Sequence, residues 1–154
     1  MSQAVSPVAP DAPLSTLEAA GLPKLWRREV VEFELAGTLS AAVLKKRHYI
    51  GKPGRIVGIS SFRRTAASGV GAADSTDVDV NLNGTSVLSA TIQHENASGN
   101  NDRLLGLLDS AHAAHDGYGV VVAPGDYLEV QIDAIEAGGT APSGLFVQID
   151  LMNG

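Results

Sequence analysis

The sequence contains no cysteine, so neither a disulfide framework nor a zinc knuckle can stabilise the fold. Aromatic residues are few, at 3 Tyr, 3 Phe and 1 Trp. No apolar stretch approaches the ~20 residues of a membrane-spanning helix, and the N-terminus lacks the charged start and apolar block of a signal peptide. We therefore expect a domain that depends on its own hydrophobic core, with no membrane as a partner.

Positive charge is almost missing from the C-terminal part of the chain. Residues 65–154 hold 1 Lys or Arg against 12 Asp and Glu, whereas residues 1–64 hold 10 against 5, so the net charge of −6 is the sum of −11 and +5. Such a division of charge is suited to docking on an oppositely charged partner. The alternative is that the basic and acidic residues only solvate loops and outer strand faces. The cluster Lys45, Lys46 and Arg47 is the candidate for electrostatic docking.

Nucleic-acid binding is not indicated, because this basic cluster is short, Tyr49 is its only nearby stacking aromatic, and the net charge has the wrong sign.

The sequence also lacks the motifs of common catalytic sites. The segment Gly58–Phe62 does not spell the G-x-S-x-G motif of a nucleophile elbow. Gly69 and Gly71 stand without the rest of a dinucleotide fingerprint, and no P-loop occurs. We expect no enzyme activity, no catalytic residue and no cofactor.

Two groups of residues could in principle bind a metal. His112 and His115, with Asp109 and Asp116 alongside, would suit a metal if the segment were helical. Asp77 and Asp79 could present two carboxylates to calcium from one face of a strand. In both cases polar loop or outer-face residues are the simpler interpretation, so we expect no metal site.

The first 27 residues differ in character from the rest. Pro7, Pro10 and Pro13 indicate an extended arm. Ser15 and Glu18 match a capping box, which predicts a short helix near residues 16–20. The apolar residues of this arm are the candidate partner-binding residues: Leu17, Leu22, Leu25 and Trp26. The arm either folds over its own domain or reaches a neighbouring subunit. We expect the second, because a Pro-rich N-terminal segment is poorly suited to pack into a core.

Residues 28–154 read as one β domain. Alternating apolar and polar residues predict strands at 29–35, 38–44, 55–62, 77–82, 86–92 and 120–122. Asn83 and Gly84 supply the positive-φ pair of a two-residue hairpin turn. Residues 63–75 read as a loop, and residues 103–108 as either a strand or one helical turn.

The clearest alternation lies at the end of the chain, at residues 126–134 and 145–151, and it predicts a closing hairpin with one buried face. About eight strands favour an all-β, jelly-roll-like antiparallel sandwich.

Four phrases of the sequence belong together: residues 49–58 (YIGKPGRIVG), 78–87 (VDVNLNGTSV), 123–130 (APGDYLEV) and 144–149 (GLFVQI). In these turns and strand starts the chain resembles small virion proteins of tailed bacteriophages over residues 38–152. The long loop at 63–75 and the Leu-rich, His-bearing segment at 104–115 depart from that pattern.

The resemblance implies a β-sandwich that serves as a capsid decoration (cement) protein, a head fibre or a tail-fibre domain. We expect the first: a protein on the outer surface of the virion capsid that binds the major capsid protein, as a homotrimer, and stabilises the head. A fibre domain that recognises a host-surface glycan is the alternative, with Tyr118 and Tyr127 as its candidate aromatics and Phe33 and Phe62 assigned to the core. A non-viral carbohydrate-binding module would explain the sandwich but not the arm.

Overall fold

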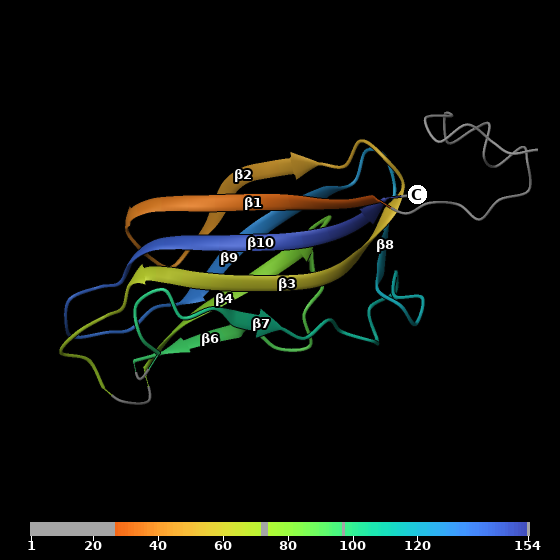
Figure 1. The fold of residues 1–154 in the computed structure, drawn as a ribbon. Helices are drawn as coiled ribbons and strands as arrows, with labels where there is room; N and C mark the ends of the chain where they lie inside the picture. Colours follow the sequence, from red (N-terminus) through yellow and green to blue (C-terminus); the bar gives the residue numbers. More distant parts are fainter. Residues whose placement is uncertain (1–26, 72–73, 97, 154) are drawn as a thin grey trace, which may run out of the picture.

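Two antiparallel sheets stack face to face in the computed structural model, which describes residues 27–71, 74–96 and 98–153. Figure 1 shows sheet A in front of sheet B. Sheet A consists of β1 (Arg27–Thr38), β10 (Ser143–Asn153), β3 (Gly54–Thr65), β7 (Leu104–Gly106) and β8 (Val120–Val122). Sheet B consists of β2 (Ala42–Tyr49), β9 (Tyr127–Ala134), β4 (Ser75–Leu82), β5 (Thr85–Ser86) and β6 (Ile92–Glu95). The described residues include no helix, and so none that could cross a membrane.

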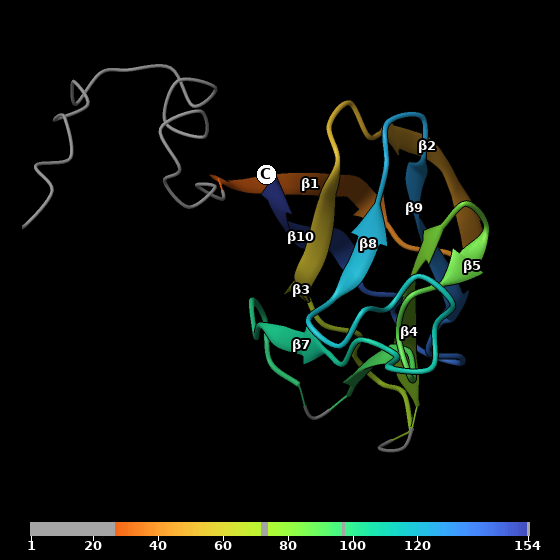
Figure 2. The same cartoon turned by 90° about the vertical axis from the view of Figure 1, so that its right-hand side faces the viewer.

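The strands pair as one long hairpin would if it were rolled up. β1 pairs with β10, β2 with β9, β3 with both β7 and β8, and β4 with both β5 and β6, all antiparallel. The contacts of β10 with β3 and of β9 with β4 then join these pairs into two sheets. Figure 2 shows β8 beside β3, with β7 further along the same strand. This nested order is that of a jelly roll, which confirms the expected fold class.

The core lies between the two sheets and is filled by the inward residues of the alternating strands. In β9, Leu128, Val130 and Ile132 are buried, as the alternation predicts. The facing positions of β10 are Leu145, Val147, Ile149 and Leu151, all of them buried. A sandwich core of aliphatic side chains therefore stabilises the fold.

The expected closing hairpin is wrong. β9 belongs to sheet B, where it pairs with β2 and β4, whereas β10 belongs to sheet A, where it pairs with β1 and β3. Residues 135–142 cross from one sheet to the other. Alternation shows that each strand has one buried face, but the inner faces of the two sheets look the same in sequence, so the pattern does not reveal the neighbour.

Other expected elements are confirmed with shifted bounds. Asn83 and Gly84 have φ values of 52° and 84°, as the hairpin turn between β4 and β5 requires. The segment near 103–108 forms a strand, β7. The expected strand at 86–92 is replaced by the short β5 and β6, which both pair with β4. Together with β7, this raises the expected number of about eight strands to ten among the described residues.

Gly119 allows β8 to lie against β3. A Cβ atom at this position would come within 2.2 Å of the backbone oxygen of Ile56. We expect Gly119→Ala to lower the free energy of unfolding by about 1–3 kcal/mol, the usual cost of overpacking, in urea denaturation. Gly51→Ala is the matched control, because nothing lies within 4 Å of a Cβ there. Equal effects of the two substitutions would contradict this account of Gly119.

Candidate protein-docking surface

In the described part of the chain, the exposed large apolar side chains lie almost entirely on one side of the molecule. Among the described residues, six of the seven exposed large hydrophobic side chains belong to strands of sheet A or to the segment between β7 and β8: Val30, Val57, Leu105, Leu107, Tyr118 and Val121. The seventh, Tyr49, lies on β2 of sheet B. Exposed apolar side chains that gather on one side of a protein mark interaction sites.

Strand register arranges the outer side of sheet A in rows. One row contains Arg28, Met152, Arg55 and Val121. Another contains Glu32, Gln148, Ser60 and Leu105. Because every second side chain of a strand points outward, these rows define the surface that sheet A presents to a partner.

A small hollow on this surface lies between Val57 and Leu105, with a volume of about 210 Å³. Leu105 and Leu107 are 80% and 73% exposed and, being two residues apart in extended chain, lie on the same side. We call Val57, Leu105 and Leu107 the apolar patch. Two charged residues border the hollow: Arg103, which donates to Ser60 Oγ and Gln148 Oε1, and Asp150, which accepts from Arg28 at 2.9 Å.

Phe62 belongs to this outer surface and not to the core, which corrects the expectation from the sequence. Its ring stacks on that of Phe146 of β10, with centroids 4.6 Å apart. The guanidinium of Arg64 lies 5.3 Å from the centroid of the Phe146 ring. A β-bulge in β3 opposite Asp150 and Leu151 shifts the alternation after Ile56, so Phe62 points away from the core, whereas Phe33 is buried as expected.

The loop before β8 adds an exposed aromatic ring beside a charged pair. Tyr118 is 83% exposed, and the guanidinium of Arg55 lies 5.8 Å from the centroid of its ring. Arg55 forms an ion pair with Asp116, and its hydrogen bond holds the pKa of the Asp116 carboxyl below the usual value. This pair orients the loop toward sheet A.

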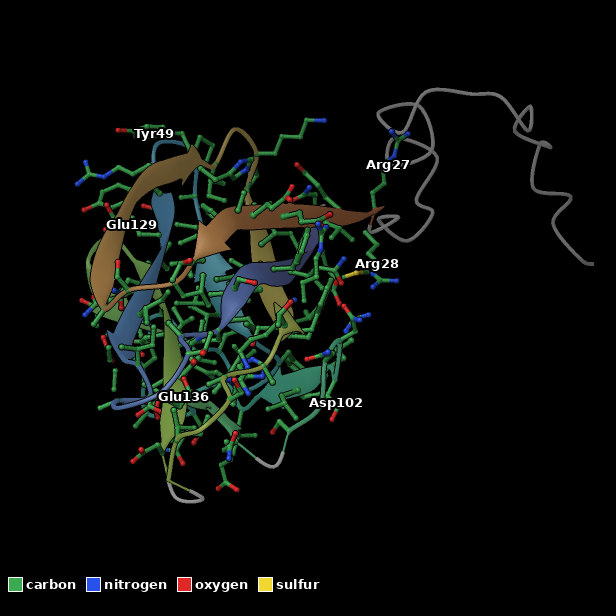
Figure 3. The ribbon with its side chains drawn as sticks, turned by 90° about the vertical axis from the view of Figure 1, so that its left-hand side faces the viewer. Arg27, Arg28, Tyr49, Asp102, Glu129 and Glu136 are labelled. Carbon is green, nitrogen blue, oxygen red and sulfur yellow. The ribbon has the colours of Figure 1, made fainter. Side chains whose placement is uncertain are left out.

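The outer side of sheet B, where its side chains are described, carries four carboxylates and the neighbouring rings of Tyr49 and Tyr127. Figure 3 shows Tyr49 and Glu129 on this side of the molecule. Arg47 donates to Glu129 Oε1 at 2.6 Å and stacks 4.3 Å from the centroid of the Tyr127 ring. The hydrogen bond from Arg47 to Glu129 raises the pKa of the Arg47 guanidinium. The charge of Arg47 is thus already compensated within the domain.

The side chains of the other candidate docking residues are not described by the structure. Lys45 and Lys46 belong to β2, but their side chains lie outside the described part of the structure. Leu17, Leu22, Leu25 and Trp26, and the helix expected near residues 16–20, also lie outside the described residues. Their roles remain predictions.

The two aspartates of β4 are tied into the surface of sheet B. Asp77 accepts a hydrogen bond from Ser75, and Asp79 accepts from Ser86 and from the backbone N–H of Val80. Burial raises the pKa of the Asp79 carboxyl. These contacts suit a structural role for both aspartates.

The histidine segment is a loop in which side chains accept hydrogen bonds from the backbone two residues later. His112 Nδ1 accepts from Ala114, His115 Nδ1 from Gly117, and Asp109 from Ala111. In the described ranges no three His, Asp or Glu residues come together as a metal site would require.

A groove of about 440 Å³ runs between the β4–β5 turn and this loop. Asn83, Asp109, His112 and Asp126 are among its lining residues, and the lining includes no Phe, Tyr or Trp. Stacking aromatics are what the glycan-binding alternative expects, so this groove does not support it.

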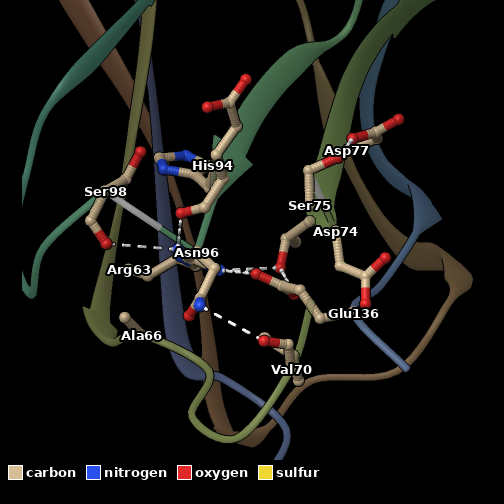
Figure 4. Close-up of polar contacts among 12 residues, drawn as sticks. Arg63, Ala66, Val70, Asp74, Ser75, Asp77, His94, Asn96, Ser98 and Glu136 are labelled. Atoms are coloured by element: carbon tan, nitrogen blue, oxygen red, sulfur yellow. Dashed lines mark hydrogen bonds and ion pairs between the residues drawn. The ribbon is translucent and has the colours of Figure 1, made fainter. Parts of the chain in front are cut away.

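Figure 4 shows a polar cluster buried between the sheets. The side chains of Arg63 and Glu136 form an ion pair with no solvent exposure. Thr76 donates to Glu136 Oε2 at 2.5 Å, and Arg63 donates to the backbone oxygen of Glu95 at 2.9 Å. The cluster ties β3, β4, β6 and the 135–142 segment to one another.

Ser61 Oγ and His94 Nε2 lie 2.6 Å apart beside this cluster. Such a distance also occurs between a nucleophile and its base, but both residues are 1% exposed, which leaves no space for a substrate. Burial, with a further contribution from the charge of Arg63, lowers the pKa of His94 to about 4. The sequence offered no signal for this pair, because its members lie in separate strands.

No protein-family model, no curated protein and no solved structure matches this chain. The fold and the surfaces described above therefore carry the functional argument.

Proposed function

We propose that this chain is a bacteriophage capsid decoration protein. It binds the lattice of the major capsid protein on the outer surface of the head, as a homotrimer, and stabilises the shell. Anything that binds only the assembled state stabilises that state by linkage. The jelly roll supplies a compact module, and the turn and strand motifs of the sequence resemble those of small phage virion proteins.

The composition of the outer side of sheet A carries this proposal. Protein interfaces are enriched in aromatic residues, Met and Arg. The outer side of sheet A combines all three, at Phe62, Phe146 and Met152 and at the arginines Arg28, Arg55 and Arg64. This is the composition of a surface that binds protein.

The two sheets suit opposite surroundings. The outer side of sheet B carries four carboxylates, of which that of Asp133 is exposed and those of Asp79 and Glu129 are covered by neighbouring side chains, with Arg47 paired to Glu129. Charged surfaces of one sign favour solvation over association. We place sheet A toward the shell and sheet B toward solvent, and the N-terminal arm, with Leu17, Leu22, Leu25 and Trp26, between neighbouring subunits.

A head- or tail-fibre domain that binds a host glycan is less well supported. Tyr118 is exposed but packs beside Arg55 on a loop, and Tyr127 is covered by Arg47. Neither ring lines a described groove. Tyr49 is exposed and its ring centroid lies 6.0 Å from that of Tyr127, but the two planes are inclined by 58° and Arg47 covers Tyr127, so the pair forms no flat platform for a sugar.

Shell binding tests the proposal. Shells assembled without this chain should bind it and become more resistant to heat, followed by light scattering during a temperature ramp. Arg64→Glu should weaken binding about tenfold or more, as loss of an interface hot spot does. Lys52→Glu changes charge equally in the turn before β3 and should bind normally. Absence of binding, or unchanged heat resistance of shells that have bound the chain, would refute decoration.

A further inference from the structure

We infer that the apolar patch formed by Val57, Leu105 and Leu107 is the docking site for the N-terminal arm of a neighbouring copy of this chain. The inference rests on the proposed self-association of the chain but not on its binding to a shell. In this contact between subunits, the apolar patch of one copy binds the arm of the next.

The hollow in the patch is suited to an apolar side chain. Its volume of about 210 Å³ lies below the ~300–1,000 Å³ of small-molecule pockets. Arg103 and Asp150 at its border already have partners in Gln148 and Arg28, so a charged occupant would gain little. An apolar side chain would instead remove Val57 and Leu105 from water.

The arm has the matching chemistry. Residues 14–26 read LSTLEAAGLPKLW and hold four leucines and the single tryptophan of the chain. Segments that bind outside their own domain can cover much partner surface per residue. They anchor through a few apolar side chains, and Trp is the most favoured residue for such an anchor.

Chain length keeps the last two anchor residues of the arm, Leu25 and Trp26, from Leu105 of their own domain. β1 begins at Arg27, and β7 is separated from β1 by β10 and β3, which places Leu105 roughly 14 Å or more across the sheet. Leu105 is moreover in the row of Glu32, four residues beyond Arg28. Three extended residues span at most about 11 Å. On their own domain the backbones of Leu25 and Trp26 therefore fall short of Leu105, and only the more distant Leu17 and Leu22 could reach it. On a neighbouring copy all four anchor residues can reach the apolar patch.

Cysteine cross-linking of the free protein tests this joint, because the natural chain has no cysteine. Full-length chains with Leu22→Cys and full-length chains with Leu105→Cys, carrying different tags, are mixed and oxidised. We expect disulfides that join the two tags. Tyr49→Cys on sheet B is the matched control partner, since Tyr49 is an exposed apolar side chain on the opposite side. Equal yields with the Leu105 and Tyr49 variants would overturn the inference.

Fluorescence of Trp26 gives a second measurement that needs no cross-link. In the full-length oligomer its emission should shift to the red with Leu105→Asp, and the sedimentation coefficient should fall, while Tyr49→Asp changes neither. A protected Trp26 in a chain that sediments as a monomer would overturn the inference in favour of docking on the same domain. Both experiments use free protein, so their failure is distinct from a failure of shell binding.

Discussion

Removing one partner of the buried ion pair between Arg63 and Glu136 should lower the free energy of unfolding by about 3–5 kcal/mol, the usual cost of leaving a buried charge uncompensated. Both side chains are fully buried, and Thr76 adds a hydrogen bond to the carboxylate. We expect this loss for Arg63→Met and for Glu136→Leu in urea denaturation followed by circular dichroism.

The double variant Arg63→Met/Glu136→Leu is the control that separates charge from packing. Replacing both members of a buried pair with apolar residues is often close to neutral. The double variant should therefore be more stable than either single variant, which is a coupling that residues in contact can show. Additive losses would mean that the backbone contacts of Arg63, such as that to Glu95, matter more than the ion pair.

Acidification should destabilise the domain through His94. Its pKa is about 4 in the folded protein, against an ordinary value of 6.5, so the unfolded chain binds a proton at a higher pH than the folded one does. The free energy of unfolding is therefore highest above pH 6.5, where His94 is neutral in both states, and it decreases as the pH falls toward 4. The shift corresponds to roughly 3 kcal/mol.

Carboxylates also titrate in this range, so the measurement is a comparison with His94→Gln. The variant should lose less stability than the natural protein between pH 6.5 and 4, in denaturant titrations at each pH. His48→Gln, on the edge strand β2, should retain the full loss. Parallel curves for the natural protein and His94→Gln would show that His94 does not govern this pH dependence.

If both expectations hold, the members of the polar cluster depend on one another in the core, and the loss of any one of them destabilises the fold. The cluster connects β3 and β4, which belong to different sheets, at the end of the sandwich where residues 135–142 cross between them. It thereby holds sheet A as a rigid support for the docking surface. Arg63, Glu136 and His94 are all buried, so their substitution leaves the outer side of sheet A unchanged and shell binding can be measured independently.

The sequence by itself determined the class of fold. Period-2 alternation in β4, β9 and β10 showed which face of each strand is buried, and Asn83 with Gly84 specified a tight turn, because these signals depend only on local backbone geometry. The candidate site was predictable only in part: the charge division was visible, but the outward direction of Phe62 and the exposure of Leu105 were not.

Only the tertiary structure decided which strands are neighbours, and with that everything that depends on pairing. It separated β9 and β10 into different sheets, paired Arg63 with the distant Glu136, and brought Val57 beside Leu105. Alternation carries no information on the partner of a strand. Long-range pairing is selected by the packing of the entire core, so the docking surface and the buried cluster appear only once the chain is folded.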